Sequence, residues 1–162
     1  MTIVAFCFDG KFHTRIVPPG DSVTGETYLD FIRSLNHHFS RLRQHNLQLH
    51  EMVLQHDNAR PHIKACVKQY IASKGVTLLK QAQYSPDTNM LDRWMFSVFE
   101  QRRKNTSFSN EDEVQIFLTT FMRSLALEAH QYQHLKWKED LQAIIVRLAI
   151  YLAIPNILLF IH

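Results

Sequence analysis

Residues 52–62 read MVLQHDNARPH, and this stretch decides the fold. Its short apolar start is bounded by polar residues, which predicts a buried strand that ends at about Asp57. The following residues predict a turn into a helix, because Pro61 would suit the first helical position. An aspartate here can project into the crevice beyond the end of a strand. The alternative is an aspartate that caps a helix or forms a turn, and the spacing alone favours that alternative.

Downstream of this turn, the pattern alternates between helix and strand. Apolar residues at helical spacing predict a helix that ends at Gly75, and residues 76–79 predict a second buried strand. Residues 84–87, YSPD, predict a loop, because a residue that precedes proline avoids the helical conformation. A helix is then expected from about Asn89, with Asp92 in its first turn. Thirty-four residues separate Asp57 from Asp92, which leaves room for one helix, one strand and a loop.

The flanking segments complete an α/β pattern. Residues 2–17 predict a β-hairpin that turns at Asp9-Gly10, and residues 26–44 carry apolar side chains on one stripe of a helix. Ser109 and Asp112 resemble a helix-start box, and the chain behind them is predicted to be helical. The order of hairpin, helix, strand, helix, strand and further helices indicates a single α/β domain with a mixed sheet.

Composition adds few constraints. The chain has 162 residues, a net charge of +3 and a pI of about 9.0, which fits a polyanionic partner without requiring one. Two cysteines without metal-ligand spacing favour an intracellular, reducing compartment. The N-terminal residues lack the basic start and the long apolar run of a signal peptide.

The two aspartates have a chemical interpretation besides the structural one. Asp57 and Asp92 are expected to come from different elements and to meet at one edge of the sheet. Oxygen ligands that converge in this way suit a hard divalent cation such as Mg²⁺. In phosphoryl transfer, a pair of such ions activates the attacking oxygen and stabilises the leaving one.

Two linked motifs resemble those of mariner-type transposases. Residues 54–62, LQHDNARPH, resemble the block around the second catalytic aspartate of that family, and residues 84–87 followed by Asp92, Trp94 and Phe96 resemble the block around the third. The gap of 34 residues is the one that names the mariner subgroup. The Phe8-Asp9-Gly10-Lys11 segment and the loop after it resemble the second-strand region of the family. The resemblance covers roughly residues 3–140.

The resemblance implies an RNase H-like fold, with a mixed sheet flanked by helices and a helical C-terminal region. It implies that Asp57 and Asp92 bind Mg²⁺ or Mn²⁺ during cleavage and transfer of DNA strands, and that Asn58 and His62 shape the site. It further implies DNA as partner, a homodimer and a nuclear location.

This chain departs from the family at the first catalytic aspartate. In the family that residue lies on the first strand of the sheet, upstream of the segment that matches residues 3–17, so the fold is expected to lack this strand. Asp9 aligns with a non-catalytic position and is not expected to replace it. The resemblance therefore predicts weak metal binding and an inactive fragment. The alternative is a non-enzymatic DNA-binding or protein-interaction module derived from a transposon.

Two groups of side chains have both a structural and a functional interpretation. Arg102, Arg103 and Lys104 could contact DNA phosphates, or they could form a solvated helix end. His130 and His134 have the spacing of a zinc pair but no further ligand motif, so core or surface histidines are expected.

The C-terminal tail, residues 141–162, is largely apolar and is predicted to be an extension separate from the domain of residues 1–140. Its most apolar stretch, residues 148–161, has 14 residues and contains Pro155-Asn156, which is short for a membrane anchor, so a membrane partner is not expected, and a core helix or a non-family extension is favoured.

Overall fold

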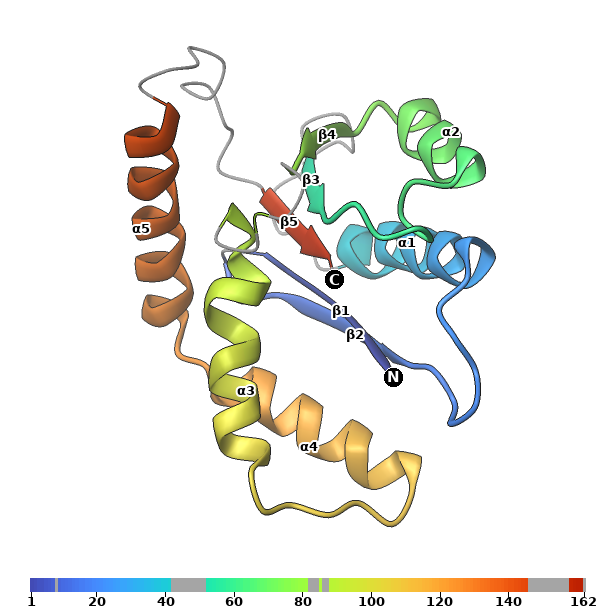
Figure 1. Cartoon of the computed structure of the whole chain (residues 1–162), viewed down its shortest axis with the longest axis vertical. Coiled ribbons are helices and arrows are strands. Elements are labelled where there is room, and N and C mark those ends of the chain that lie inside the picture. Colours follow the sequence, from blue (N-terminus) through green and yellow to red (C-terminus); the bar gives the residue numbers. More distant parts are fainter. Residues whose placement is uncertain (8, 42–51, 82–84, 86–87, 146–157, 162) are drawn as a thin grey trace.

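A five-stranded mixed sheet forms the centre of the computed structural model, and helices lie on both sides of it (Figure 1). The structure describes residues 1–7, 9–41, 52–81, 85, 88–145 and 158–161. The strands follow the order β2-β1-β5-β3-β4 across the sheet. Their bounds are β1 Thr2–Cys7, β2 Phe12–Ile16, β3 Val53–His56, β4 Thr77–Lys80 and β5 Leu158–Ile161. β1 runs antiparallel to both β2 and β5, whereas β3 runs parallel to both β4 and β5.

β1 is apolar on both faces, and each face packs in a core with helices. In β1, Ile3 and Ala5 join a core with helices α1 and α2, whereas Val4 and Phe6 join a second core with the later helices. Strands that are covered on both sides read as continuous apolar runs, as β1 does. The helices are α1 Gly25–Arg41, α2 Ala65–Ser73, the π-helix η3 Leu91–Met95, α3 Phe96–Arg103, α4 Glu111–Ser124 and α5 Leu127–Ile145.

Most of the predicted elements are present, with small corrections at their ends. Gly75 ends α2 with a φ of 67°, a conformation that glycine adopts at little cost. Pro61 is not the first helical residue as predicted, because a turn precedes α2, which begins at Ala65. The helix-start box was also placed one residue too early. Asn110 is the N-cap of α4 and accepts the backbone N–H of Glu113, whose carboxylate in turn accepts the N–H of Ser109.

The C-terminal tail differs most from expectation. A core helix or a non-family extension was favoured there; residues 158–161 form no helix but the strand β5, which lies between β1 and β3. The predicted gap in the sheet is therefore filled, and β1 and β3 are not left without a neighbour. Parts of three predicted segments lie outside the described residues. They are the end of the predicted helix, within residues 42–51, residues 84, 86 and 87 of the predicted loop, and residues 146–157 of the tail.

Within the described part of the chain, no helix combines the length and the apolar character needed to cross a membrane. The proposed division into a domain of residues 1–140 and an extension of residues 141–162 stays a prediction.

Candidate functional site

Asp57 directly follows β3, at the edge of the sheet where the parallel strands β3, β4 and β5 end. Its Oδ1 accepts two hydrogen bonds, one from the backbone N–H of Ala59 at 2.9 Å and one from Nδ1 of His62 at 2.5 Å. An ionised carboxylate only accepts hydrogen bonds, so the proton between these two side chains belongs to His62. The turn after β3 thus fixes the orientation of the Asp57 carboxylate.

His62 belongs to a buried aromatic cluster behind this carboxylate. Its ring packs on Tyr28 of α1, with ring centres 4.0 Å apart, and stacks on His56 of β3 at 5.2 Å. The Tyr28 hydroxyl bonds to Nδ1 of His56 at 2.8 Å. Sequence reasoning named His62 as a site residue but missed Tyr28 and His56. Tyr28 lies on α1, outside the motif, and His56 is the last residue of β3, within the motif.

The protonation states within this cluster follow from burial. Burial, together with the nearby His62, lowers the pKa of His56 to about 4, so its ring is neutral at pH 7. Burial and the charge of Asp57 raise the pKa of Tyr28, so its hydroxyl keeps its proton. The protonated Tyr28 hydroxyl can thus donate to Nδ1 of His56 when the proton of the neutral ring is on Nε2.

The element that carries Asp92 is attached to β3 through Thr88. The Thr88 carbonyl accepts hydrogen bonds from the Gln55 side chain at 2.9 Å and from the indole of Trp137 at 2.8 Å. Gln55 lies two residues before Asp57, and Thr88 lies four residues before Asp92, so this contact joins the two sequence motifs. Asp92 is half-buried in η3, and π-helical turns occur frequently at functional sites.

A cavity of about 430 Å³ opens beside Asp57. Asp57 and His62 line it from the turn after β3, Phe96 lines it from the start of α3, and Ile3 lines it from β1. Phe96 directly follows η3, the π-helical turn that carries Asp92. The remaining lining residues are Met1, Thr2, Ser22, Val23, Ala59 and Pro61.

Asn58 lies in the turn after β3 and Asp9 in the hairpin turn after β1, as the sequence predicts. The Asn58 amide donates to the carbonyl of Gln81 at 2.9 Å, which ties the turn after β3 to the end of β4. Asp9 lies in the hairpin turn and binds both the backbone N–H and the ammonium group of Lys11. Because β1 is antiparallel to β5, which is parallel to β3, this turn is at the opposite edge of the sheet from Asp57. The separation is roughly 15 Å along the strand direction.

The basic run is exposed at the end of α3, and two of its cations have partners within the chain. Arg103 forms an ion pair with Glu100, and Arg102 bonds to the Ser124 hydroxyl and lies over the ring of Phe121. Lys104 is exposed beyond the last helical residue.

The predicted histidine pair is in the core. His130 and His134 are both buried, at 0% and 3% exposure, and pack against aromatic rings that include Trp94 and Trp137. The prediction of core or surface histidines is therefore confirmed as core.

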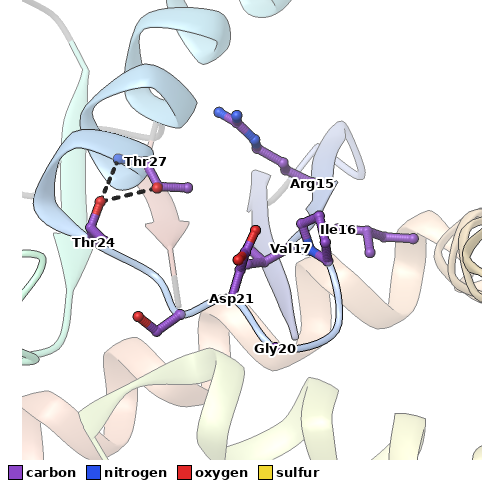
Figure 2. A pocket seen from close by; sticks show the side chains of 9 residues that line it. Arg15, Ile16, Val17, Gly20, Asp21, Thr24 and Thr27 are labelled. Carbon is purple, nitrogen blue, oxygen red and sulfur yellow. Dashed lines mark hydrogen bonds between the residues drawn. The ribbon is translucent and has the colours of Figure 1, made fainter.

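A second, larger cavity of about 570 Å³ lies at the loop between β2 and α1. Figure 2 shows its polar lining, with Arg15 from β2, Asp21 from the loop and a hydrogen-bonded pair of threonines, Thr24 and Thr27, at the start of α1. The residues that line it do not include Asp57 or the members of its aromatic cluster.

The side chains near the end of β3 include oxygen donors of the kind that the divalent cation implied by the sequence would need. Asp57 and Asp92 are carboxylates, and the buried Gln55 side-chain oxygen has no hydrogen-bond donor among the described residues. Such oxygen donors suit a hard divalent cation, which is commonly held in proteins by one or two carboxylates and completed by water or phosphate. The described residues include no group of three or more His, Cys, Asp or Glu side chains placed to hold a metal. Asp57 and Asp92 are therefore donors of the right chemical type for such a cation, and their joint binding of a metal stays a prediction.

Comparison with known proteins identifies the family of this chain. The sequence profile of the DDE superfamily endonucleases matches residues 21–115. The human histone-lysine N-methyltransferase SETMAR is 27% identical over 115 residues, which are 71% of this chain and 17% of that protein. This chain thus spans about a sixth of the length of that relative.

Solved structures show the same fold. The catalytic domain of the Mos1 mariner transposase superposes with a TM-score of 0.79 at 21% identity, covering 90% of this chain and 72% of that one. The Mos1 strand transfer complex gives a TM-score of 0.74 at 21% identity, over 83% of this chain and 38% of that one. The Mos1 catalytic domain has also been solved with raltegravir and Mn, and with raltegravir and Mg.

The sheet order and its two helical layers define an RNase H-like α/β domain. The profile match covers more than half of the chain and includes both aspartate motifs. The chain belongs to the DDE superfamily endonucleases, and its fold is similar to that of the Mos1 mariner transposase catalytic domain.

Proposed function

We propose that this domain binds DNA at the end of β3 and holds a divalent cation there weakly, without efficient strand cleavage. The observation that supports the proposal is the fixed Asp57 carboxylate, which lies beside a cavity also lined by Phe96, one turn after Asp92. Asp57 and Asp92 would be the ligands for Mg²⁺ or Mn²⁺, and Asn58 and His62 would shape the site. When bound, the cation would polarise a phosphodiester oxygen of DNA.

The neighbour of β3 supports the absence of efficient cleavage. β5 lies directly beside β3 and runs parallel to it, and its residues, LLFI, include no carboxylate. The metal-binding edge therefore receives carboxylates from the turn after β3 and from η3 but none from β5. Two carboxylates leave more of the coordination shell to water and phosphate, and we expect weak binding.

DNA is the proposed partner on two grounds. The Mos1 transposase has been solved as a paired-end complex with the left transposon end. The chain has a net charge of +3, and Lys104 is an exposed cation near the end of α3. Arg102, Arg103 and Lys104 would contact phosphates, which gives an affinity that falls with salt and carries no sequence information. A homodimer and a nuclear location belong to the same proposal.

The test combines Mn²⁺ binding, DNA retention and plasmid nicking. The wild-type chain should bind Mn²⁺ weakly, retain DNA at low salt and leave supercoiled plasmid intact with either Mg²⁺ or Mn²⁺. Asp57→Ala and Asp92→Ala should each weaken Mn²⁺ binding by about tenfold or more. Asp9→Asn is the matched control and should change none of these measurements.

Two results would contradict the proposal. Plasmid nicking by the wild type that Asp57→Ala abolishes would show an active endonuclease. Equal Mn²⁺ binding by the wild type and both alanine variants would place the cation elsewhere. Retention of DNA without nicking, together with unchanged Mn²⁺ binding, would favour a DNA-binding module that has lost the metal site.

A further inference from the structure

The place of β5 in the sheet differs from that of every other described strand. β1 and β2 form a hairpin, and β3 connects to β4 through the single helix α2. β5 comes from the end of the chain and pairs with residues that lie more than a hundred positions earlier in the sequence. In the described sheet it alone pairs with both β1 and β3, so it joins the two halves.

The gap between β1 and β3 provides pairing partners on both sides. Leu159 is in register with Cys7 of β1 and with Leu54 of β3, and Phe160 is in register with Phe6 and Gln55. The neighbouring strands contribute to apolar cores on both faces of the sheet. A strand that enters this gap must therefore be apolar on both faces, and LLFI has that composition.

We propose that the gap between β1 and β3 is a binding site for an extended apolar strand, that β5 is its ligand in cis, and that a free peptide of the same sequence can replace β5. Twelve residues, 146–157, separate the end of α5 from β5. The pairing closes the longest loops in the described sheet, and such loop closure is entropically costly. We therefore expect β5 to be the last strand to pair and the first to detach.

The partner class follows from the geometry of the site. A peptide that adds to a sheet gains its affinity from backbone hydrogen bonds and its specificity from the environment of alternate side chains. The site selects a segment of at least four apolar residues that runs parallel to β3 and antiparallel to β1. A charged residue within that segment would be buried between two helical layers and would prevent binding. This proposal requires neither metal binding nor DNA binding.

The register can be tested on the full chain with a native cysteine. Because Cys7 is paired with Leu159, the Leu159→Cys variant in a Cys66→Ser background should form an intramolecular disulfide when refolded in a glutathione redox buffer. Burial raises the pKa of the Cys7 thiol, so oxidation during refolding is preferred to oxidation of the folded chain. Phe160→Cys, which is one residue out of register with Cys7, is the matched control and should stay reduced.

A second register pair protects the test against a variant that fails to fold. Ala5→Cys combined with Ile161→Cys, in a chain whose native cysteines are replaced by serine, should also form an intramolecular disulfide. Equal oxidation of the Leu159→Cys and Phe160→Cys variants would overturn the assigned register. Disulfide-linked dimers in place of monomers would overturn occupation in cis and show that a second copy supplies the strand.

Exchange is tested by cutting the connection after folding. A protease site is introduced among residues 146–157, the folded chain is cleaved, and a fluorescent peptide of residues 156–162 is added in excess. The proposal expects stoichiometric uptake of the peptide, which the Leu159→Cys disulfide blocks. A peptide with Phe160→Asp should not bind. Failure of the labelled peptide to enter the cleaved chain, or uptake that the disulfide does not block, would overturn the proposal.

Discussion

Asp9 and Asp57 each follow a strand of the same sheet, yet they have different surroundings. Asp9 lies in the β1–β2 turn, and its carboxylate binds Lys11, whose side chain is 36% exposed. Asp57 lies after β3, and its carboxylate binds His62, whose side chain is 7% exposed. One aspartate thus has a mobile cation at the surface as its partner, whereas the other has a ring that is packed on Tyr28 and His56.

The difference shows how the edge of a sheet determines what an aspartate can do. Both carboxylates accept a hydrogen bond from the backbone two residues further on: Asp9 from the N–H of Lys11, and Asp57 from the N–H of Ala59. Asp57 also lines a cavity, and its donor His62 is buried and packs on side chains of α1 and β3. One aspartate can therefore both form a turn and face a cavity that could hold a ligand, as Asp57 does. Asp9 forms a turn as well, and the two residues differ in the packing around their carboxylates.

The largest expected effect comes from removing the partner of each aspartate. His62→Ala deletes a buried ring and its hydrogen bond, and it should lower the free energy of unfolding by about 2–4 kcal/mol. Lys11→Ala removes a half-exposed ion pair and should cost less than about 1 kcal/mol. Urea denaturation followed by circular dichroism measures both. Similar losses for the two variants would show that the Asp57 cluster is no better packed than the hairpin turn.

A smaller effect is expected one step behind Asp57. Tyr28→Phe removes the hydroxyl that donates to His56 and leaves the buried Nδ1 without its donor. We expect a loss of about 1–3 kcal/mol in the free energy of unfolding, because an unsatisfied buried acceptor keeps its desolvation cost. Tyr132→Phe is the matched control, since Tyr132 is 61% exposed on α5, and it should be neutral. Unchanged stability of the Tyr28→Phe variant would exclude Tyr28 from the support of this cluster.

The turn at Asp57 and the turn at Asp9 could both be predicted from sequence because their signals are local. An apolar run that ends in HDN and an Asp-Gly pair after a β-branched run each specify a turn within a few residues. The cap of α4 shows the limit of this reasoning. Ser109 and Asn110 are both good caps, and Asp112 and Glu113 are both acceptable partners, so only the backbone geometry decides between them.

The remaining features depend on contacts between distant parts of the sequence. Tyr28 reaches His56 across 28 positions, and nothing in its helical spacing distinguishes it from other core residues. β5 is harder still, because a short apolar run fits a buried helix and a buried strand equally well. Its strand state depends on the two partners that accept it, and these lie near the start and the middle of the chain.

The smallest effect concerns the histidine beside Asp9. Burial lowers the pKa of His130 from its usual value near 6.5, and the charge of Asp9 partly opposes this. A histidine whose pKa is lowered by folding contributes its full stability above pH 6.5 and loses it as the pH falls toward the folded-state pKa. Asp9→Asn removes the opposing charge, so the pKa of His130 should fall further and the loss of stability in acid should increase. NMR titration of the His130 ring measures the first effect, and melting temperatures at pH 7.5 and pH 5 measure the second. Asp30→Asn, an exposed position on α1, is the control. A rise in the pKa of His130 in the Asp9→Asn variant would contradict the electrostatic effect of Asp9 on this ring. Asp9 and Asp57 would then differ only in the side chains to which their carboxylates bind directly.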